Sequence, residues 1–386
     1  MITTKDPQKI ELSMLMEPIA GPCISLYAPM EKASQSEQNP IRVQNLLRQA
    51  AAILSEREHS QDEIRQWLKP VESMLADRPY WENQKLGFAA FLSPQQSWLL
   101  ELDLKVPEQV RVGQHFHLKP LLPMFGEAHR FYLLSLSQNC VRLFDCSPGH
   151  CQKLTLPQGL PESMQDFDLF QGNTGTDYRQ GRTQAFSGAS GATHGVGLKN
   201  DELEEPRLQF LRQINQGLTG FLGSQNVPLV LAGVDDLVHA LRKELDYSGV
   251  FPDHLSGNFD HTNPDELHSK ALPLAQKHFQ QLEQQAVDGY HAALATQKAS
   301  SDLDQVLPAA MDGRIETLFV ARGQNVWGQV SQQGRKLDRL PSDHPQASDL
   351  LDLTAMETLR NGGRVFALEM AAMPDVASPI SAVFRY

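Results

Sequence analysis

Apolar and polar side chains follow two different periods in the first part of the chain. Residues 23–28 form an apolar run between two prolines, which predicts a buried strand. Apolar positions in 43–54 recur at helical spacing, and Asn39, directly before a proline, would cap that helix. Another helix should open at Ser60, because a glutamate three residues later completes a capping box. These elements predict an α/β domain over residues 1–125, with further strands near 86–92 and 97–104.

The middle of the chain alternates hairpin, helix and strand patterns. Residues 131–144 predict a β-hairpin that turns at Gln138-Asn139. The apolar run 228–233 predicts a buried central strand. Asp235 follows this run, either as a helix cap, which we favour, or as a functional carboxylate at the end of the sheet. We expect a mixed sheet flanked by helices over residues 126–297. Its other elements are a strand near 152–156 and helices near 203–222, 237–245 and 264–297.

The last part of the chain repeats a smaller alternation of helices and strands. Residues 303–311 and 350–359 have the apolar spacing of helices, and 315–320 reads as a strand. Further strands are expected near 325–330, 364–368 and 382–384. This order predicts an α-β-α sandwich over residues 298–386. The fold class is therefore α/β in three domains, and a chain of 386 residues is long enough for more than one core.

Composition is that of an ordinary globular protein, with 41% hydrophobic and 21% charged residues. No run approaches the roughly 18 apolar residues that a membrane helix needs, and residues 1–6 lack the basic-then-apolar pattern of a signal peptide. We expect a soluble, cytoplasmic protein that enters no membrane. The net charge of −12 argues against coating DNA or RNA with the whole surface. It leaves room for protein partners or one local contact with RNA.

One polar segment, residues 157–202, is much longer than the connections of compact domains, which seldom exceed about 12–15 residues without a function or disorder. Its glycines would let the backbone approach RNA or a peptide, and its arginines could neutralise phosphates. From 169 to 200 its net charge is +2, with Asp177 as the one acidic residue. A disordered insertion without function is the alternative. We assign to an RNA-binding loop Arg179, Arg182, Gln184, Gly188, Gly191, His194, Gly195, Gly197 and Lys199.

The cysteines and the glycine runs match no common catalytic or metal motif. Cys140, Cys146 and Cys151, with His150 beside the last, have no common zinc-finger spacing, so buried thiols are the favoured interpretation. The glycines of residues 188–197 form neither a Walker A, a dinucleotide nor a nucleophile-elbow pattern. We therefore predict no metal, no cofactor and no hydrolase of those kinds.

Two pairs of polar residues have plain structural interpretations. His115 and His117 would share one face of a strand, but no third ligand lies near them, so surface or core histidines are favoured over a metal pair. Glu204-Glu205 fits the first turn of a helix, where negative charge is favourable.

Four local runs follow one another in a recognisable order. Residues 130–139, then the glycine-rich loop, then 230–235 resemble the middle domain of archaeal and eukaryotic release factors and Pelota. Residues 313–320 and 362–365 resemble their C-terminal domain, which is similar to ribosomal protein L7Ae. The likeness covers nearly the whole chain from residue 20 onward. It extends to the bacterial members of this superfamily, which include the ribosome hibernation factor Balon.

This resemblance implies a tRNA-shaped protein in the ribosomal A site. In release factors the middle-domain loop ends in Gly-Gly-Gln, whose glutamine helps water attack the peptidyl-tRNA ester. No Gly-Gly-Gln occurs in this sequence; Gln180-Gly181-Arg182 and Arg182-Thr183-Gln184 stand in the equivalent loop instead. Because positioning of the water depends on those residues, we expect docking without ester hydrolysis, and we assign no catalytic residue.

The function that the resemblance implies is a ribosome-binding translation factor of the hibernation or rescue type, active in a stress response. Its implied partners are the 70S ribosome, through 23S and 16S rRNA at the A site, and elongation factor Tu, but not DNA. Two alternatives stay open. One is a peptidyl-tRNA hydrolase that uses Gln184 in place of the missing glutamine. The other is a stand-alone protein-interaction module that has kept the fold.

Overall fold

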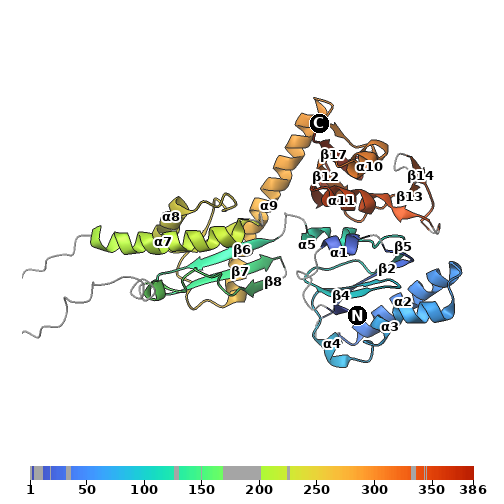
Figure 1. The fold of residues 1–386 in the computed structure, drawn as a ribbon, viewed down its shortest axis with the longest axis horizontal. Helices are drawn as coiled ribbons and strands as arrows, with labels where there is room; N and C mark the ends of the chain where they lie inside the picture. The colour runs from blue at the N-terminus through green and yellow to red at the C-terminus, as the bar shows by residue number, and fades with distance from the viewer. Residues whose placement is uncertain are drawn as a thin grey trace, which may run out of the picture. The chain divides into compact units, whose positions relative to one another are not determined.

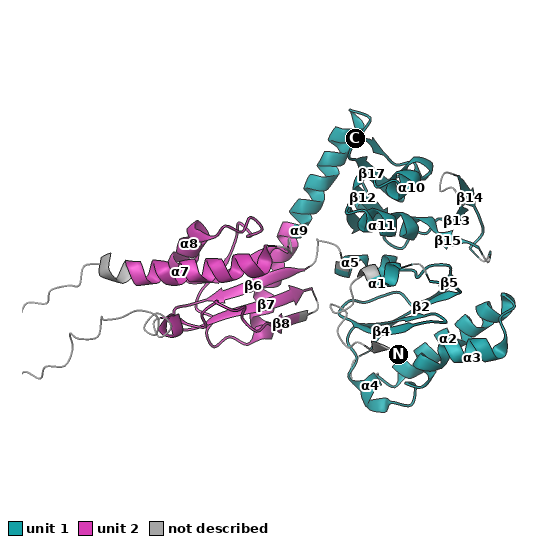
Figure 2. Cartoon of the chain, viewed as in Figure 1, with its two compact units in different colours: residues 1–129, 279–386 teal, residues 130–278 magenta. Residues whose placement is uncertain are grey.

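The computed structural model describes residues 2–3, 12–17, 19–31, 36–125, 130–148, 150–167, 201–223, 227–331, 336–342, 344 and 346–386. The chain divides into two compact units: a first unit of residues 1–129 with 279–386, and a second unit of residues 130–278 (Figure 2). Both contain sheets covered by helices, which confirms the α/β class. The division into three domains near 125 and 297 stays a prediction. Among the described residues, no helix is long and apolar enough to cross a membrane.

The N-terminal part of the first unit is a five-stranded sheet in the order β1-β4-β3-β2-β5. Its neighbouring strands are antiparallel, except that β1 and β4 are parallel. The strands are β1 (Ile2–Thr3), β2 (Cys23–Pro29), β3 (Gly87–Leu92), β4 (Ser97–Leu102) and β5 (Gln109–Gly113). The helices are α1 (Leu12–Met16), α2 (Gln38–Glu56), α3 (Gln61–Glu72), α4 (Arg78–Glu82) and α5 (Leu122–Phe125).

Helices α2 and α3 cover one face of this sheet (Figure 1). Apolar side chains at helical spacing, such as Leu46 and Leu68, pack there against the alternate strand residues Leu26 and Phe88. The predicted capping box is confirmed at Ser60, whose hydroxyl accepts from the backbone N–H of Glu63 while its own N–H donates to that glutamate. This reciprocal pair satisfies two N–H groups that would otherwise lack a partner at the helix start.

The prediction that Asn39 caps α2 is wrong. The helix begins one residue earlier, at Gln38, and Asn39 is buried inside its first turn. Its amide instead exchanges two hydrogen bonds with the backbone of Glu31 and donates a third to the carbonyl of Trp81. The side chain therefore ties the loop at Glu31 to helix α4, because a buried amide needs partners for both its N–H and its C=O groups.

The C-terminal part of the first unit is a three-layer α-β-α arrangement, as expected. The sheet order is β11-β17-β12-β16, and a separate small sheet has the order β14-β13-β15. Helices α10 (Leu303–Met311) and α11 (Leu350–Arg360) pack on one face of the four-stranded sheet, against strand residues such as Leu318. On the other face Tyr290, near the end of α9 (Pro264–Leu294), packs against Phe319. The strands are β11 (Ala299–Ser300), β12 (Ile315–Ala321), β13 (Trp327–Val330), β14 (Leu337–Arg339), β15 (Ser348–Asp349), β16 (Arg364–Leu368) and β17 (Ile380–Phe384).

One continuous hydrophobic core joins these two parts within the first unit. It includes Tyr27 and Trp98 from the N-terminal sheet and Leu351 from α11. Polar contacts reinforce the junction: the ammonium of Lys119 bonds the carboxylate of Asp349, and both side chains are buried. The N-terminal sheet is thereby covered by helices on one face and by the C-terminal part on the other.

The second unit is a mixed sheet in the order β10-β9-β6-β7-β8. Strands β6, β9 and β10 are parallel neighbours, whereas β7 and β8 add antiparallel hairpins. The strands are β6 (Phe131–Leu136), β7 (Val141–Ser147), β8 (His150–Lys153), β9 (Leu229–Gly233) and β10 (Leu255–Ser256). The helices are α7 (Asp201–Leu222), α8 (Asp235–Glu244) and the first turns of α9. The expected mixed sheet with flanking helices is therefore present.

Alternate residues of these strands face different helices, as the two-residue period of a strand requires. Tyr132 and Leu143 lie in one core with α7 and α8, which Figure 1 shows on one side of β6 and β7. Phe131, of opposite parity, stacks on His268 of α9, with ring centroids 6.3 Å apart. The imidazole of His268 also bonds the carbonyl of Ser147 at 2.8 Å. The first turns of α9 thus cover the second face.

Candidate functional site

The residues that we assigned to an RNA-binding loop lie outside the described residues. These are Arg179, Arg182, Gln184, Gly188, Gly191, His194, Gly195, Gly197 and Lys199. The structure does describe the two ends of the segment that contains them, up to Phe167 and from Asp201 onward. The structure therefore shows how the two ends of the assigned loop are anchored, at Phe167 and at Asp201.

The N-terminal anchor is packed onto the sheet. Residues 157–163 contain no helix or strand, which fits a loop-like segment, whereas residues 164–167 form a helical turn. The N–H of Val141 donates to the carbonyl of Glu162 at 2.7 Å, and the N–H of Met164 donates to the carbonyl of Gln138 at 2.8 Å. These bonds fasten the segment to the turn between β6 and β7, at the carboxyl end of β6. Leu160 and Phe167 are both 6% exposed. The chain is thus fixed up to Phe167.

The C-terminal anchor is helix α7. Phe167 meets Phe210 of this helix edge to face, with ring centroids 6.0 Å apart, a favourable aromatic geometry. Leu160 of the same segment packs against Gly217, which lies further along α7. Segment 157–167 therefore packs along the helix by which the chain returns. The packed segment 157–167 and helix α7 therefore hold the two ends of the assigned loop on the same side of the second unit.

Asp235 occupies a different role from the one that we favoured. The residue at the cap of α8 is Val234, and Asp235 lies in the first turn. Its carboxylate contacts Nε2 of His254 at 2.9 Å. The pKa of Asp235 is lowered by a hydrogen bond from Ser256 and, next, by His254. His239 adds a second imidazole, whose ring centroid lies 5.3 Å from that of His254.

This carboxylate–imidazole pair was missed by sequence reasoning because His254 follows 19 positions later in a stretch without periodicity. It stands just past the carboxyl end of β9, where open α/β sheets often place functional groups. Asp236 is exposed in the same turn. Within the described part of the chain, no group of three or more His, Cys, Asp or Glu side chains could hold a metal ion.

The three clustered cysteines separate into a single residue and a pair. Cys140 precedes β7, whereas Cys146 in β7 lies directly opposite Cys151 in β8. Cys146 is buried, as expected for a structural thiol, but Cys140 and Cys151 are partly exposed. Burial, and then the contact with Cys151, raise the pKa of the Cys146 thiol.

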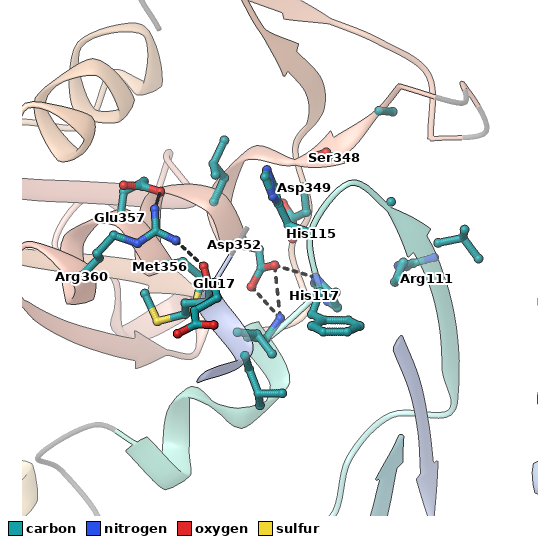
Figure 3. A pocket seen from close by; sticks show the side chains of 18 of the residues that line it. Glu17, Arg111, His115, His117, Ser348, Asp349, Asp352, Met356, Glu357 and Arg360 are labelled. Carbon is teal, nitrogen blue, oxygen red and sulfur yellow. Dashed lines mark hydrogen bonds and ion pairs between the residues drawn. The ribbon is translucent and has the colours of Figure 1, made fainter. Parts of the chain in front are cut away.

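His115 and His117 border one pocket of the first unit. Figure 3 shows this pocket, which encloses about 80 Å³ and is lined by residues of the 111–118 segment and of α11. Nδ1 of His117 lies 3.3 Å from Asp352, which also accepts a 3.0 Å bond from the N–H of Leu118. His115 is exposed at the rim, and His117 is buried.

Asp352 is the residue of this pocket that sequence reasoning missed. It lies among apolar positions of α11 and is 7% exposed. Buried carboxylates need donors, and here a backbone N–H and an imidazole supply them. A charged residue inside an apolar helical stripe is the signal that could have found it. At this pocket Asp352 of α11 therefore contacts His117 and Leu118 of the N-terminal part. Glu205, from the acidic pair in α7, is exposed in the first turns, as expected.

Comparison with known proteins places the second unit in a family. Residues 130–314 match the family model for Bacterial archaeo-eukaryotic release factor family 3. No curated protein matches the chain. Among solved structures, the archaeal translation termination factor aRF1 is 13% identical, with 97% of this chain and 96% of that chain covered and a TM-score of 0.24.

Two further structures show the same low level of similarity. Dom34 of S. cerevisiae, a translation termination-like factor involved in RNA quality control, is 12% identical over 78% of this chain and 74% of its own, with a TM-score of 0.38. A model of ribosome-bound archaeal Pelota and ABCE1 is 9% identical over 97% and 92% of the chains, with a TM-score of 0.41. Of these comparisons, the family match alone therefore bears on the role of this chain.

Proposed function

We propose, from the bacterial archaeo-eukaryotic release-factor-like family to which this chain belongs, that it is a ribosome-binding translation factor of the hibernation or rescue type. It occupies the A site and presents the segment around Arg179 and Arg182 to rRNA. The observation that carries this proposal is the extent of the family match, residues 130–314, which includes the assigned loop and both of its anchors. The release-factor-like family supports a role in translation.

The local chemistry supports RNA docking rather than ester hydrolysis. The stretch from 169 to 200 carries a net charge of +2 within a chain of −12, and arginine forks match phosphate oxygens. A fixed base on α7 lowers the entropy that such a loop loses on binding. The sequence contains no Gly-Gly-Gln, so the group that would position the attacking water is not supplied. Partners under this proposal are 23S and 16S rRNA in the 70S particle and elongation factor Tu, in the cytoplasm.

Ribosome pelleting tests the proposal. The purified protein should sediment with 70S particles, and Arg179→Ala with Arg182→Ala should weaken this binding. Loss of two phosphate contacts should lower the slope of log affinity against log salt by up to about 2. Arg48→Ala with Arg65→Ala is the matched control, because both of these arginines are exposed on the helices of the first unit. Equal binding by the loop variant and the control variant contradicts the assignment of the loop.

The hydrolase alternative rests on Gln184, the glutamine that follows Arg182-Thr183 in the same segment. An enzyme of this kind would release peptide from stalled ribosomal complexes, and Gln184→Ala would stop the release without reducing pelleting. Release by the unchanged protein would replace the docking proposal with this one. If the protein shows no pelleting and no peptide release at any concentration, that result would favour the stand-alone interaction module.

A further inference from the structure

Two cysteines face each other on neighbouring strands of the second unit. The register of β7 and β8 places Cys146 directly opposite Cys151, and their sulfur atoms lie 2.7 Å apart. The N–H of Leu154 donates to the carbonyl of Leu143 in the same ladder. Since hydrogen-bonded and non-hydrogen-bonded pairs alternate in an antiparallel ladder, the cysteines occupy a non-hydrogen-bonded pair, the kind in which facing side chains lie closer together.

The geometry of such a pair matches that of a disulfide. Cα atoms of a non-hydrogen-bonded pair are about 4.5 Å apart, inside the range of roughly 4.4–6.8 Å that disulfides use. A bond of about 2.05 Å between the sulfurs requires them to approach further, by side-chain rotation in place. Both thiols are free in the structure. The strands therefore hold two reduced sulfurs in a position from which they can be joined.

The two thiols differ in their access to solvent. Cys146 has an exposed fraction of 0% and lies on the sheet face that α9 covers, whereas Cys151 is partly exposed. A small oxidant therefore reaches Cys151 first and meets Cys146 only as a neighbour of Cys151. We propose that Cys151 and Cys146 form a reversible oxidation site, in which a hydroperoxide oxidises Cys151 and Cys146 resolves the product as a disulfide.

The reaction balances without any further reactant. The Cys151 thiol releases its proton, and its sulfur attacks the terminal oxygen of the hydroperoxide. The O–O bond breaks, and the leaving hydroxide or alkoxide takes up a proton, which leaves Cys151 sulfenic acid and water or an alcohol. The Cys146 sulfur then attacks the sulfenic sulfur, the S–O bond breaks, and the leaving hydroxide takes the Cys146 proton as water. Two thiols are oxidised by two electrons, and the hydroperoxide is reduced by the same two. A small dithiol reverses the bond by exchange.

Oxidation would fix the strand that leads towards the assigned loop. Cys151 lies in β8, from which the chain continues through residues 154–167. The same hairpin is already held at its tip by the bond between Ser147 and His268. A disulfide restricts the opening of β7 from β8, so the amides of residues 143–154 should exchange more slowly with solvent after oxidation. This site is independent of the proposed ribosome binding.

Mass spectrometry of the unchanged protein tests the proposal. After exposure to hydrogen peroxide, free thiols are alkylated and the chain is digested with trypsin. Both cysteines fall in one peptide, Leu143–Lys153, because Arg142 precedes it and Lys153 ends it. This peptide should be unalkylated and lighter by two hydrogens, and it should return to the doubly alkylated form after treatment with dithiothreitol. Cys140, in the preceding peptide, is the internal comparator and should remain alkylated.

Two variants separate the roles of the sulfurs. In Cys146→Ser, the sulfenic acid of Cys151 should persist and be trapped by dimedone. In Cys151→Ser, Cys146 should stay reduced at the same peroxide dose. The proposal is overturned if the peptide of the unchanged protein stays doubly alkylated at doses that oxidise Cys140. It is also overturned if Cys151 proceeds to the sulfinic acid without joining Cys146, or if Cys146 reacts equally fast without Cys151.

Discussion

Gly217 of helix α7 lies so close to Leu160 that no side chain fits between them. A Cβ atom added at Gly217 would stand 2.8 Å from the Cβ and 3.2 Å from the Cα of Leu160. Neither atom is the free end of a flexible side chain, so relief would require the backbone of the 157–167 segment to move. The absence of a side chain at position 217 is therefore what allows the N-terminal anchor of the assigned loop to rest on α7.

Gly217→Ala should loosen this anchor. Overpacking costs about 1–3 kcal/mol, whereas replacing glycine by alanine inside a helix returns about 1 kcal/mol. The expected net effect is a destabilisation of about 1 kcal/mol, seen as faster amide exchange in residues 157–167 by mass spectrometry. Gly220→Ala is the matched control in the same helix, because nothing lies within 4 Å of its added Cβ. The control should slow exchange in α7, and equal behaviour of the two variants would contradict the close contact.

Lys119→Met should destabilise the first unit strongly. The side chains of Lys119 and Asp349 are 7% and 1% exposed, so the substitution leaves a buried carboxylate without its cation. Removal of one partner from a buried ion pair costs about 3–5 kcal/mol. All four tryptophans (Trp67, Trp81, Trp98 and Trp327) belong to the first unit, so their fluorescence in urea follows its unfolding alone.

The matched control for this ion pair is Lys336→Met. Lys336 pairs with Asp338 in the same unit, but their side chains are 79% and 44% exposed. Exposed pairs contribute about 0–1 kcal/mol, because water already solvates both charges. A loss of stability in Lys119→Met no greater than that in the control would show that the buried pair does not hold the junction.

Features that depend on neighbouring residues were predictable from the sequence. The helix at Leu303–Met311, the strand at Arg364–Leu368 and the capping box at Ser60 all have the predicted bounds or bonds. Each is encoded within one or two turns of chain, by apolar spacing or by a side chain and a backbone N–H three residues apart. The order of the elements followed from the same local signals and gave the α/β class.

Partnerships between distant residues were not predictable. Asn39 and Asp235 both match the residue types of helix caps, yet their side chains bind Trp81 and His254, which local propensity does not encode. Lys119 and Asp349 are 230 positions apart and meet only once the core of the first unit has formed. The glycine-rich stretch has no apolar periodicity, so its sequence predicts a charge and a composition without a conformation.

Alkaline pH should destabilise the first unit through Cys23. Burial raises the pKa of this thiol from 9.0 to about 12. Between these values the unfolded chain loses a proton that the folded chain retains, so the stabilising contribution is complete below pH 9.0 and is lost as pH rises towards 12. The slope is about 1.4 kcal/mol per pH unit for one proton.

Cys23→Ala should remove this part of the pH dependence. The free energy of unfolding, measured by tryptophan fluorescence at several pH values above 9.0, should fall less steeply in the variant by one proton. Tyr27 remains as a second alkaline group, because burial and then Asp352 raise its pKa. Identical slopes in the variant and the unchanged protein would mean that the thiol is not shielded from water.

Asn39→Asp distinguishes a helix cap from a buried tie. Asparagine and aspartate are nearly equivalent as caps, so a capping Asn39 would tolerate the change. In the structure the side-chain N–H groups of Asn39 instead donate to the carbonyls of Glu31 and Trp81, at 2.9 and 3.2 Å. A carboxylate there has no N–H to donate, faces two carbonyl oxygens, and is 0% exposed. Because unsatisfied buried groups cost about 1–3 kcal/mol each and an unpaired charge costs more, we expect a loss of about 3 kcal/mol or more.

Urea unfolding followed by tryptophan fluorescence measures this loss, since Trp81 itself accepts one of the bonds. Asn45→Asp is the matched control: it makes the same chemical change at an exposed residue of α2, whose side-chain oxygen accepts a bond from Arg48 that an aspartate can also accept. Surface substitutions of this kind stay within about 0.5 kcal/mol. Nearly equal unfolding midpoints for the two variants would indicate that Asn39 acts as a helix cap. A large gap between them would establish that the start of α2 is positioned by Glu31 and by Trp81 of α4, because the helix then depends on partners that its own sequence does not contain.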